Sequence, residues 1–237
     1  EKGAPKHVFN STMPLCIGAN VHTVKKGKDL PRVRKIQFYS HAIIDDVRIY
    51  NRALSTGEVK ALHDLEKPDY SKNLDQGLVA YYPFSANAKD ESGNGHHGEV
   101  NGATLTTDRH GKSNNAYSFG GEKSIIAKDL AFESRYTLSV WFKSKSTTES
   151  MMILAMQKGS ANHSHAFIQH NLSEPSHING IRACNRMPAA EGGGNNIYNG
   201  NNLHDSTWHH ATAVKSGDEF SLFIDGVLAS KIKDETK

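Results

Sequence analysis

The chain has 237 residues, and its 28 Lys and Arg residues nearly balance its 25 Asp and Glu residues, for a formal net charge of +3. This balance argues against a general nucleic-acid binder and against an acidic disordered tail. The longest wholly apolar run, residues 151–156, is far shorter than the ~18 residues of a membrane-spanning helix. We therefore expect a globular chain without nucleic-acid binding or membrane insertion.

The N-terminal quarter combines a basic segment with a strand. Six cations lie within residues 25–35, namely Lys25, Lys26, Lys28, Arg32, Arg34 and Lys35. Residues 1–72 carry 13 basic and 8 acidic residues, whereas the remainder carries 15 and 17. The basic segment is either a solvated hairpin loop or a patch for an anionic polysaccharide or a partner surface. Residues 44–50 then alternate apolar and polar side chains with the period of a strand.

One helix is predicted, over residues 55–65. Ser55 can cap it, and Glu58 stands three residues later, as in a capping box. Its apolar face consists of Val59, Leu62 and Leu65. The following residues, 65–75, are polar, contain a Pro and lack periodicity, which is typical of a linker or a long surface connection.

The rest of the chain has the period of strands. Residues 136–143 and 220–225 alternate, and short β-branched or aromatic runs recur between clusters of Gly, Asn and Asp. This pattern is typical of a sandwich or barrel. Asp225-Gly226 lies between two such runs and predicts a tight hairpin. The sequence therefore predicts an all-β architecture with one short helix.

Nine segments carry recognisable motifs. They are residues 15–20 (LCIGAN), 44–55 (IDDVRIYNRALS), 77–84 (GLVAYYPF), 90–98 (DESGNGHHG), 100–104 (VNGAT), 116–120 (AYSFG), 136–142 (YTLSVWF), 208–214 (WHHATAV) and 222–227 (LFIDGV). Together they resemble the laminin-G-like, concanavalin A-like lectin-glucanase family. The resemblance implies a two-sheet antiparallel jelly-roll sandwich.

The segments stand in an unusual order, because the family's closing segment (residues 44–55) precedes its opening strand (residues 77–84). We predict that residues 1–66 hold the last strands and closing helix, residues 67–76 a linker, and residues 77–237 the first and central strands. Either this is one circularly permuted sandwich, or the chain holds half-domains of adjacent repeats. Such halves would complete one another within the chain or between neighbouring copies.

The resemblance implies a structural calcium ion where the loop of residues 90–98 meets the family's last strand. Ca²⁺ takes six to eight oxygen ligands from carboxylates, amides and backbone carbonyls. Asp90 and Asn94 can supply two of them. Asp45 is the expected partner because alternation places it on the inward face with Val47, and Asp46 is the second choice. The alternative is that Asp90 and Asn94 merely form Asx turns.

The sequence disfavours an enzyme. A glycosidase needs two carboxylates on one face, and alternation predicts opposite faces for Asp45 and Asp46. Residues 168–170 (Ile-Gln-His) resemble a strand motif of jelly-roll alginate lyases, with Arg182 nearby in sequence. Gln169 and His170 are adjacent, however, and therefore face opposite sides. The spacing of the 14 histidines does not show the convergence typical of a zinc or copper site.

Residues 185–206 are rich in Asn and Gly, and are either a ligand-binding loop or a surface insertion. Amides suit sugar hydroxyls, and an aromatic ring suits a pyranose face. The candidate ligand residues are Gln169, His170, Arg182, Asn185, Asn196, Tyr198 and Asn199. Cys16 and Cys184 either form one disulfide or remain buried thiols.

These features predict a secreted or cell-surface, non-catalytic module that binds a polysaccharide or glycoprotein glycan, or acts in adhesion, with Ca²⁺ holding its loops. The second hypothesis is a structural subunit of a surface filament or repeat array, assembled from complementing half-domains. A polysaccharide lyase or glycoside hydrolase is the third.

Overall fold

The computed structural model describes residues 15–25, 32–37, 39–64, 74–130, 134–145, 151–157, 164–171, 180–186 and 194–235. Of residues 20–25, 32–37, 157, 164–165 and 171 only the backbone is described.

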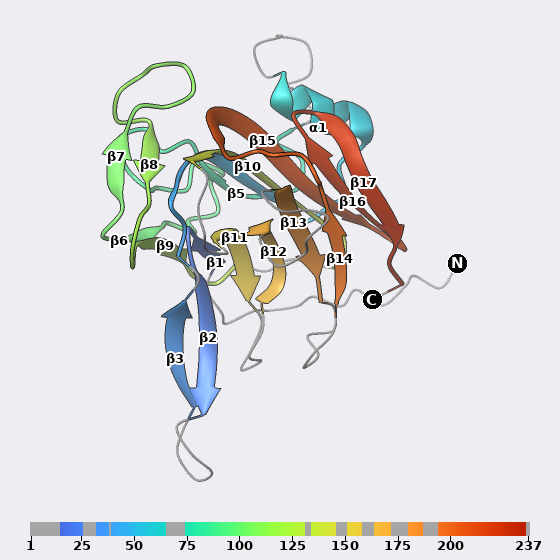
Figure 1. The fold of residues 1–237 in the computed structure, drawn as a ribbon, viewed down its shortest axis with the longest axis horizontal. Coiled ribbons are helices and arrows are strands. Elements are labelled where there is room, and N and C mark those ends of the chain that lie inside the picture. Colours follow the sequence, from blue (N-terminus) through green and yellow to red (C-terminus); the bar gives the residue numbers. More distant parts are fainter. Residues whose placement is uncertain are drawn as a thin grey trace.

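Two antiparallel sheets form the body of the molecule (Figure 1). We call them sheet I and sheet II. Within the described residues, sheet I has the strand order β14-β13-β12-β11-β1-β9-β6. Its strands are β1 (Leu15–Ile17), β6 (Glu99–Asn101), β9 (Ser124–Ala127), β11 (Met152–Gln157), β12 (Ser164–Asn171), β13 (Gly180–Asn185) and β14 (Asn195–Tyr198).

Sheet II has the order β17-β16-β15-β10-β4-β8-β7, and β5 also pairs with β4. Its strands are β4 (Ala42–Tyr50), β5 (Leu78–Tyr82), β7 (Thr104–Thr106), β8 (Ala116–Ser118), β10 (Tyr136–Lys145), β15 (Asp205–Ser216), β16 (Glu219–Ile224) and β17 (Val227–Lys233). The predicted all-β, two-sheet antiparallel sandwich with one short helix is confirmed.

Strands from the N-terminal quarter occupy interior positions in both sheets. Strand β1 lies between β11 and β9, and β4 lies between β10 and β8. Strand β4, from the segment expected to close the family's domain, pairs with β5, from the segment expected to open it, with Val47 opposite Tyr82. Both sheets therefore combine residues from the first and third predicted segments. Most of the predicted linker, residues 67–73, lies outside the described residues.

The main hydrophobic core lies between the sheets. Strand β10 contributes Leu138, Val140 and Phe142, and β12 and β13 contribute Ile168 and Ile181 from the opposite side. Every second residue of these strands points inward, as alternation requires. Each such side chain stabilises the fold by about 1.5–3 kcal/mol relative to an exposed one.

Helix α1 (Thr56–His63) covers the outer face of sheet II, above β15 and β16 (Figure 1). The predicted capping box is present, because Glu58 N donates to Ser55 Oγ and Ser55 N donates to the Glu58 carboxylate. Val59 and Leu62 pack against Val214 and Phe223. Leu65, the third residue of the predicted apolar face, lies outside the described residues.

Two of the hairpins contain segments that the sequence singled out. The predicted Asp225-Gly226 turn joins β16 to β17, with positive φ angles of 50° and 74°, as a type I′ turn requires. Strands β2 (Asn20–Lys25) and β3 (Arg32–Gln37) form a two-stranded ribbon that projects from the body (Figure 1). This ribbon carries four of the six clustered cations, whereas Lys26 and Lys28 lie outside the described residues.

Candidate functional site

Three neighbouring strands bring polar and aromatic side chains together on the outer side of sheet I. Strand register places Gln169, Arg182 and Tyr198 directly opposite one another across β12, β13 and β14. The neighbouring row of side chains on the same outer face consists of Phe167, Cys184 and Asn196. Opposed residues of paired strands lie on the same face. We call Phe167, Gln169, Arg182, Arg186, Asn196 and Tyr198 the edge patch.

Two guanidinium groups lie over one aromatic ring in the edge patch. The Cζ atoms of Arg182 and Arg186 are 5.1 and 5.3 Å from the centroid of the Phe167 ring. Arg182 Nε donates a hydrogen bond of 2.9 Å to Asn196 Oδ1, whereas Arg186 Nε is buried without a partner. Among the described residues, Arg48, Arg52 and Arg109 form ion pairs with carboxylates. No such ion pair involves Arg182 or Arg186. Within the described part of the chain, no carboxylate therefore pairs with either cation of the edge patch.

Beside the edge patch, a small apolar cluster lies on the same outer side of sheet I. It consists of Cys16, Met152, Ala155, Phe167 and Cys184. Both cysteines are buried thiols, and burial raises the pKa of the Cys184 thiol. Strands β11 and β12 separate β1 from β13, so the two cysteines are roughly 14 Å apart at ~4.8 Å per strand. A disulfide spans less than about 7 Å between Cα atoms, which excludes this pairing.

The loop of residues 90–98 is organised by one carboxylate. Asp90 accepts hydrogen bonds from the backbone N–H groups of Tyr81 (2.9 Å), Ser92 (2.9 Å) and His96 (3.0 Å), and from Ser92 Oγ (2.9 Å). Burial by itself would raise the pKa of Asp90, but these donors lower it below its ordinary value. A carboxylate offers about four acceptor positions. Those of Asp90 are occupied by the protein itself.

The side-chain amide of Asn94 in the same loop points at backbone carbonyls. Its Nδ2 atom donates to the oxygens of Leu78 and Val79, each at 3.0 Å. This nitrogen is a donor and cannot bind a cation. The bond from Ser92 N–H to Asp90 is that of the Asx-turn alternative, whereas Asn94 ties the loop to the carbonyls of Leu78 and Val79.

Asp45 and Asp46 both face the outer side of sheet II and share one arginine. Arg109 Nη1 lies 2.7 Å from Asp45, and Arg109 Nη2 lies 2.9 Å from Asp46. The prediction that the two aspartates face opposite sides is wrong. A β-bulge interrupts alternation there, since the register shifts between Ser139 and Trp141 and Asp46 adopts a φ of 47°.

The surroundings drive the pKa values of these two aspartates apart. Burial raises the pKa of Asp45 to about 7, with the neighbouring Asp46 charge acting in the same direction. Burial also opposes ionisation of Asp46, but the charges of Arg48 and Arg109 lower its pKa. Trp141 lies opposite Asp45 on β10, and the Arg109 guanidinium is 4.8 Å from its ring.

The four predicted calcium ligands thus belong to two separate networks. Across the described part of the chain, no three His, Cys, Asp or Glu side chains gather into a set that could hold a metal ion. As arranged, Asp90, Asn94, Asp45 and Asp46 do not fit one calcium ion. Calcium binding stays a prediction.

A family model described as the concanavalin A-like lectin/glucanases superfamily matches residues 119–237, which is half of the chain. The chain belongs to this superfamily. The match includes β12, β13 and β14, the strands that carry the edge patch. Comparison with curated proteins and with solved structures gave no match. Membership fits carbohydrate-binding and adhesion-type modules in general.

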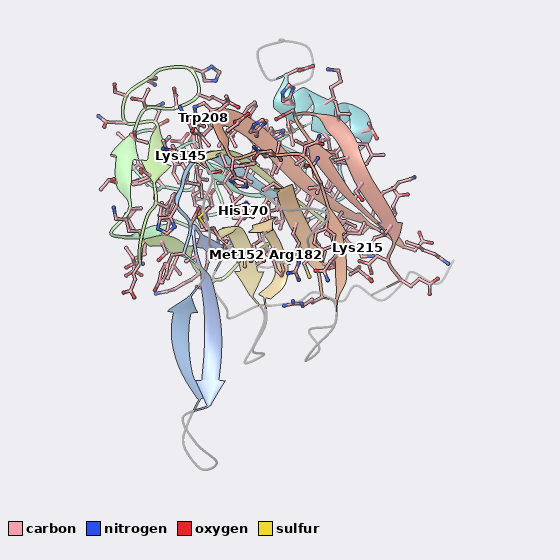
Figure 2. The ribbon with its side chains drawn as sticks, viewed as in Figure 1. Lys145, Met152, His170, Arg182, Trp208 and Lys215 are labelled. Carbon is pink, nitrogen blue, oxygen red and sulfur yellow. The ribbon has the colours of Figure 1, made fainter. Side chains whose placement is uncertain are left out.

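In this superfamily member, four of the seven predicted ligand residues, Gln169, Arg182, Asn196 and Tyr198, meet in the edge patch. Arg182 is labelled in Figure 2. The other three lie elsewhere. His170 faces the interior and is 0% exposed. Asn185 donates to Asp234 at 2.7 Å inside the sandwich. Asn199 is buried and accepts from the backbone N–H of Asn201 at 2.9 Å.

Two members of the edge patch, Phe167 and Arg186, were not among the predicted ligand residues. Phe167 stands two residues before Gln169, and Arg186 stands four residues after Arg182. Both intervals are even, so strict alternation along β12 and β13 was the signal that could have found them.

A hollow of about 410 Å³ lies beside the loop of residues 90–98, at the β6 and β9 edge of sheet I. His96, Glu99, Ile126 and Lys128 line it. Ile126 also packs against the outer apolar cluster. The hollow and the edge patch therefore lie on the same side of sheet I, toward opposite edges.

Proposed function

We propose that this chain is a carbohydrate-binding or adhesion module that holds a glycan on the edge patch. The observation that carries the proposal is the pair of guanidinium groups over Phe167, beside the amide of Asn196. Membership in the superfamily supports the general class of function.

The chemistry of the edge patch favours a glycan that carries carboxylate or sulfate groups. A guanidinium presents a planar fork of donors that matches such anions with two hydrogen bonds. Arg182 and Arg186 have no carboxylate partner among the described residues, so a bound anion would supply the missing charge. Asn196 adds an amide for hydroxyl groups and Tyr198 adds an aromatic ring, whereas Gln169 is buried beside them.

The module is proposed to act without catalysis. Gln169 and His170, the pair resembling the lyase motif, lie on opposite sides of β12, as alternation predicted. Asp45 and Asp46 are buried against arginines instead of facing each other across an open cleft. Both observations support a binding role.

A position outside the cell or on its surface is part of the proposal. Glycans of the proposed kind are abundant there, and the superfamily description names lectins. In the described segments, no helix is long and apolar enough to cross a membrane.

The test is retention on immobilised polysaccharides, run with calcium and again with chelator, together with an assay for newly released chain ends. Polygalacturonate and its methyl ester form a matched pair that differs in charge. We expect retention on the acidic form, no product, and at least tenfold weaker binding of R182Q and R186Q. R135Q, which changes an exposed arginine next to β10, is the control and should bind like wild type. Absence of retention on every glycan would contradict the proposal, and released ends would contradict its non-catalytic part.

A second candidate is a structural subunit whose copies exchange strands. The favouring observation is that β1 and β4, from the N-terminal quarter, lie inside both sheets. Exchange of these strands between copies would link subunits. Light scattering over a hundredfold range of concentration should then show growing mass, and a constant monomer mass excludes this candidate.

A further inference from the structure

The hollow beside the loop of residues 90–98 lies apart from the edge patch. It is at the β6 and β9 edge of sheet I, whereas the edge patch is at the β14 edge (Figure 1). Its volume of about 410 Å³ is within the range of about 300–1,000 Å³ that is usual for small-molecule sites. The side chains considered below belong to the loop, to β6, and to β9 with the two residues after it, namely His96, His97, Glu99, Ile126, Lys128 and Asp129.

Hydrogen bonds hold the loop side of the hollow in place from behind. The Asp90 carboxylate accepts from the backbone N–H of His96 at 3.0 Å, and the Tyr82 hydroxyl donates to the His96 carbonyl at 2.6 Å. The backbone N–H of Asp90 donates to Nδ1 of His97 at 3.2 Å. A wall that is already ordered loses little conformational entropy when a ligand binds.

The same contacts fix which ring nitrogens remain for a ligand. Since Nδ1 of His97 accepts from Asp90, the proton of the neutral ring is on Nε2, which is a donor. Nδ1 of His96 lies 3.2 Å from the carbonyl oxygen of Lys128. A carbonyl only accepts, so this Nδ1 carries the proton and Nε2 of His96 is an acceptor. The two imidazoles therefore leave one donor and one acceptor.

The charged side chains of the hollow do not match those of the edge patch. Glu99 and Asp129 supply two carboxylates, whereas Lys128 supplies one ammonium group, 3.6 Å from Glu99. An anionic sugar is therefore repelled here, while it is attracted by the two arginines of the edge patch. Carboxylates accept hydrogen bonds from hydroxyl groups, and an ammonium group donates them. Partly exposed Ile126 adds apolar surface for the C–H groups of a sugar ring.

We propose that the hollow binds one neutral sugar unit through its hydroxyl groups. Glu99 and Asp129 accept from these hydroxyls, Lys128 and His97 donate to them, and Ile126 packs against the ring. The inference goes beyond the proposed function, because it assigns a second site with a different ligand chemistry. The module then recognises acidic units at one edge of sheet I and neutral units at the other.

The test is titration of ¹⁵N-labelled protein with the methyl glycosides of glucose, galactose, mannose and N-acetylglucosamine, followed by backbone amide shifts. At least one of these sugars should shift the amides of residues 94–99 and 126–129. E99Q and D129N replace exposed carboxylates by amides of the same shape, and each should weaken binding about fivefold. E122Q is the matched control, since Glu122 is an exposed carboxylate before β9 that does not line the hollow, and it should bind like wild type.

A charged analogue separates this site from the edge patch. Methyl glucuronide differs from methyl glucoside in one carboxylate, and should bind more weakly at residues 94–99 and 126–129. R182Q should leave the shifts caused by neutral sugars unchanged, so failure at the edge patch and failure at the hollow are distinct results. The inference is overturned if no neutral sugar shifts these amides, if E99Q and D129N bind like wild type, or if the glucuronide binds there as tightly as the glucoside.

Discussion

Acidification should destabilise the fold through three buried histidines. His170, His204 and His210 are 0%, 3% and 1% exposed. Burial lowers their pKa values to about 3, about 4 and about 3. In the unfolded chain these side chains regain a pKa near 6.5. Between pH 6.5 and pH 4, the unfolded state therefore binds protons that the folded state does not bind. The free energy of unfolding falls as the pH falls.

The magnitude follows from linkage. Between pH 7.5 and pH 5, each histidine costs about 2 kcal/mol of folding free energy, or about 6 kcal/mol for the three. Asp45 has the opposite effect on stability. Because its pKa is raised to about 7, the folded state binds a proton in this pH range that the unfolded state does not bind. Binding of this proton stabilises the folded state by about 2–3 kcal/mol over the same pH range. The raised pKa of His209, held by the Asp225 carboxylate, adds a smaller gain. The net loss is about 3 kcal/mol.

The assay is urea unfolding at several pH values from 7.5 to 5. Wild type should lose about 3 kcal/mol over this range, whereas H210N should lose about 2 kcal/mol less. The slope with pH is the readout, because H210N also disturbs the 2.8 Å contact between His210 and Ser139 at every pH. A wild-type stability that is flat or rises on acidification would refute the reasoning, as would an unchanged slope in H210N.

Two further predictions concern the acidic residues. R109Q leaves Asp45 and Asp46 buried with one arginine fewer, so the free energy of unfolding in urea at pH 7.5 should drop by about 3 kcal/mol; a loss below about 1 kcal/mol would contradict the ion-pair assignment. Calcium should leave the Tm unchanged relative to chelator, because protein donors occupy the Asp90 carboxylate. A site saturated at 100 times its Kd would instead add about 2.7 kcal/mol, and a rise in Tm that D90N abolishes would support the predicted calcium site.

Local signals in the sequence predicted much of the fold. The alternation of residues 136–143 predicted a strand that lies at the centre of sheet II as β10. Ser55 and Glu58 predicted the start of α1, since a capping box depends only on residues three apart. Asp225-Gly226 predicted its hairpin because few residue pairs tolerate two positive φ angles. In each case the physical cause lies within a few neighbouring residues.

The errors arose where the cause lies outside the segment. Asp46 adopts a positive φ in a bulge that shows itself only when β4 is aligned with β10, so alternation alone misplaced the two aspartates. Arg109, their partner, is more than 60 residues away in sequence. The meeting of His170 with His204 likewise follows from how the sheets pack, and the spacing of histidines could not show it.

The adjacent residues Gln169 and His170 show why neighbours in sequence need not belong to one site. A strand turns successive side chains to opposite sides, so Gln169 joins the edge patch while His170 meets His204 between the sheets. The resemblance of residues 168–170 to a catalytic motif assumes that both side chains reach one substrate. In this fold the two side chains lie on opposite faces of β12 and cannot reach one substrate. R182Q lies on β13 and tests the edge patch without altering β12 itself.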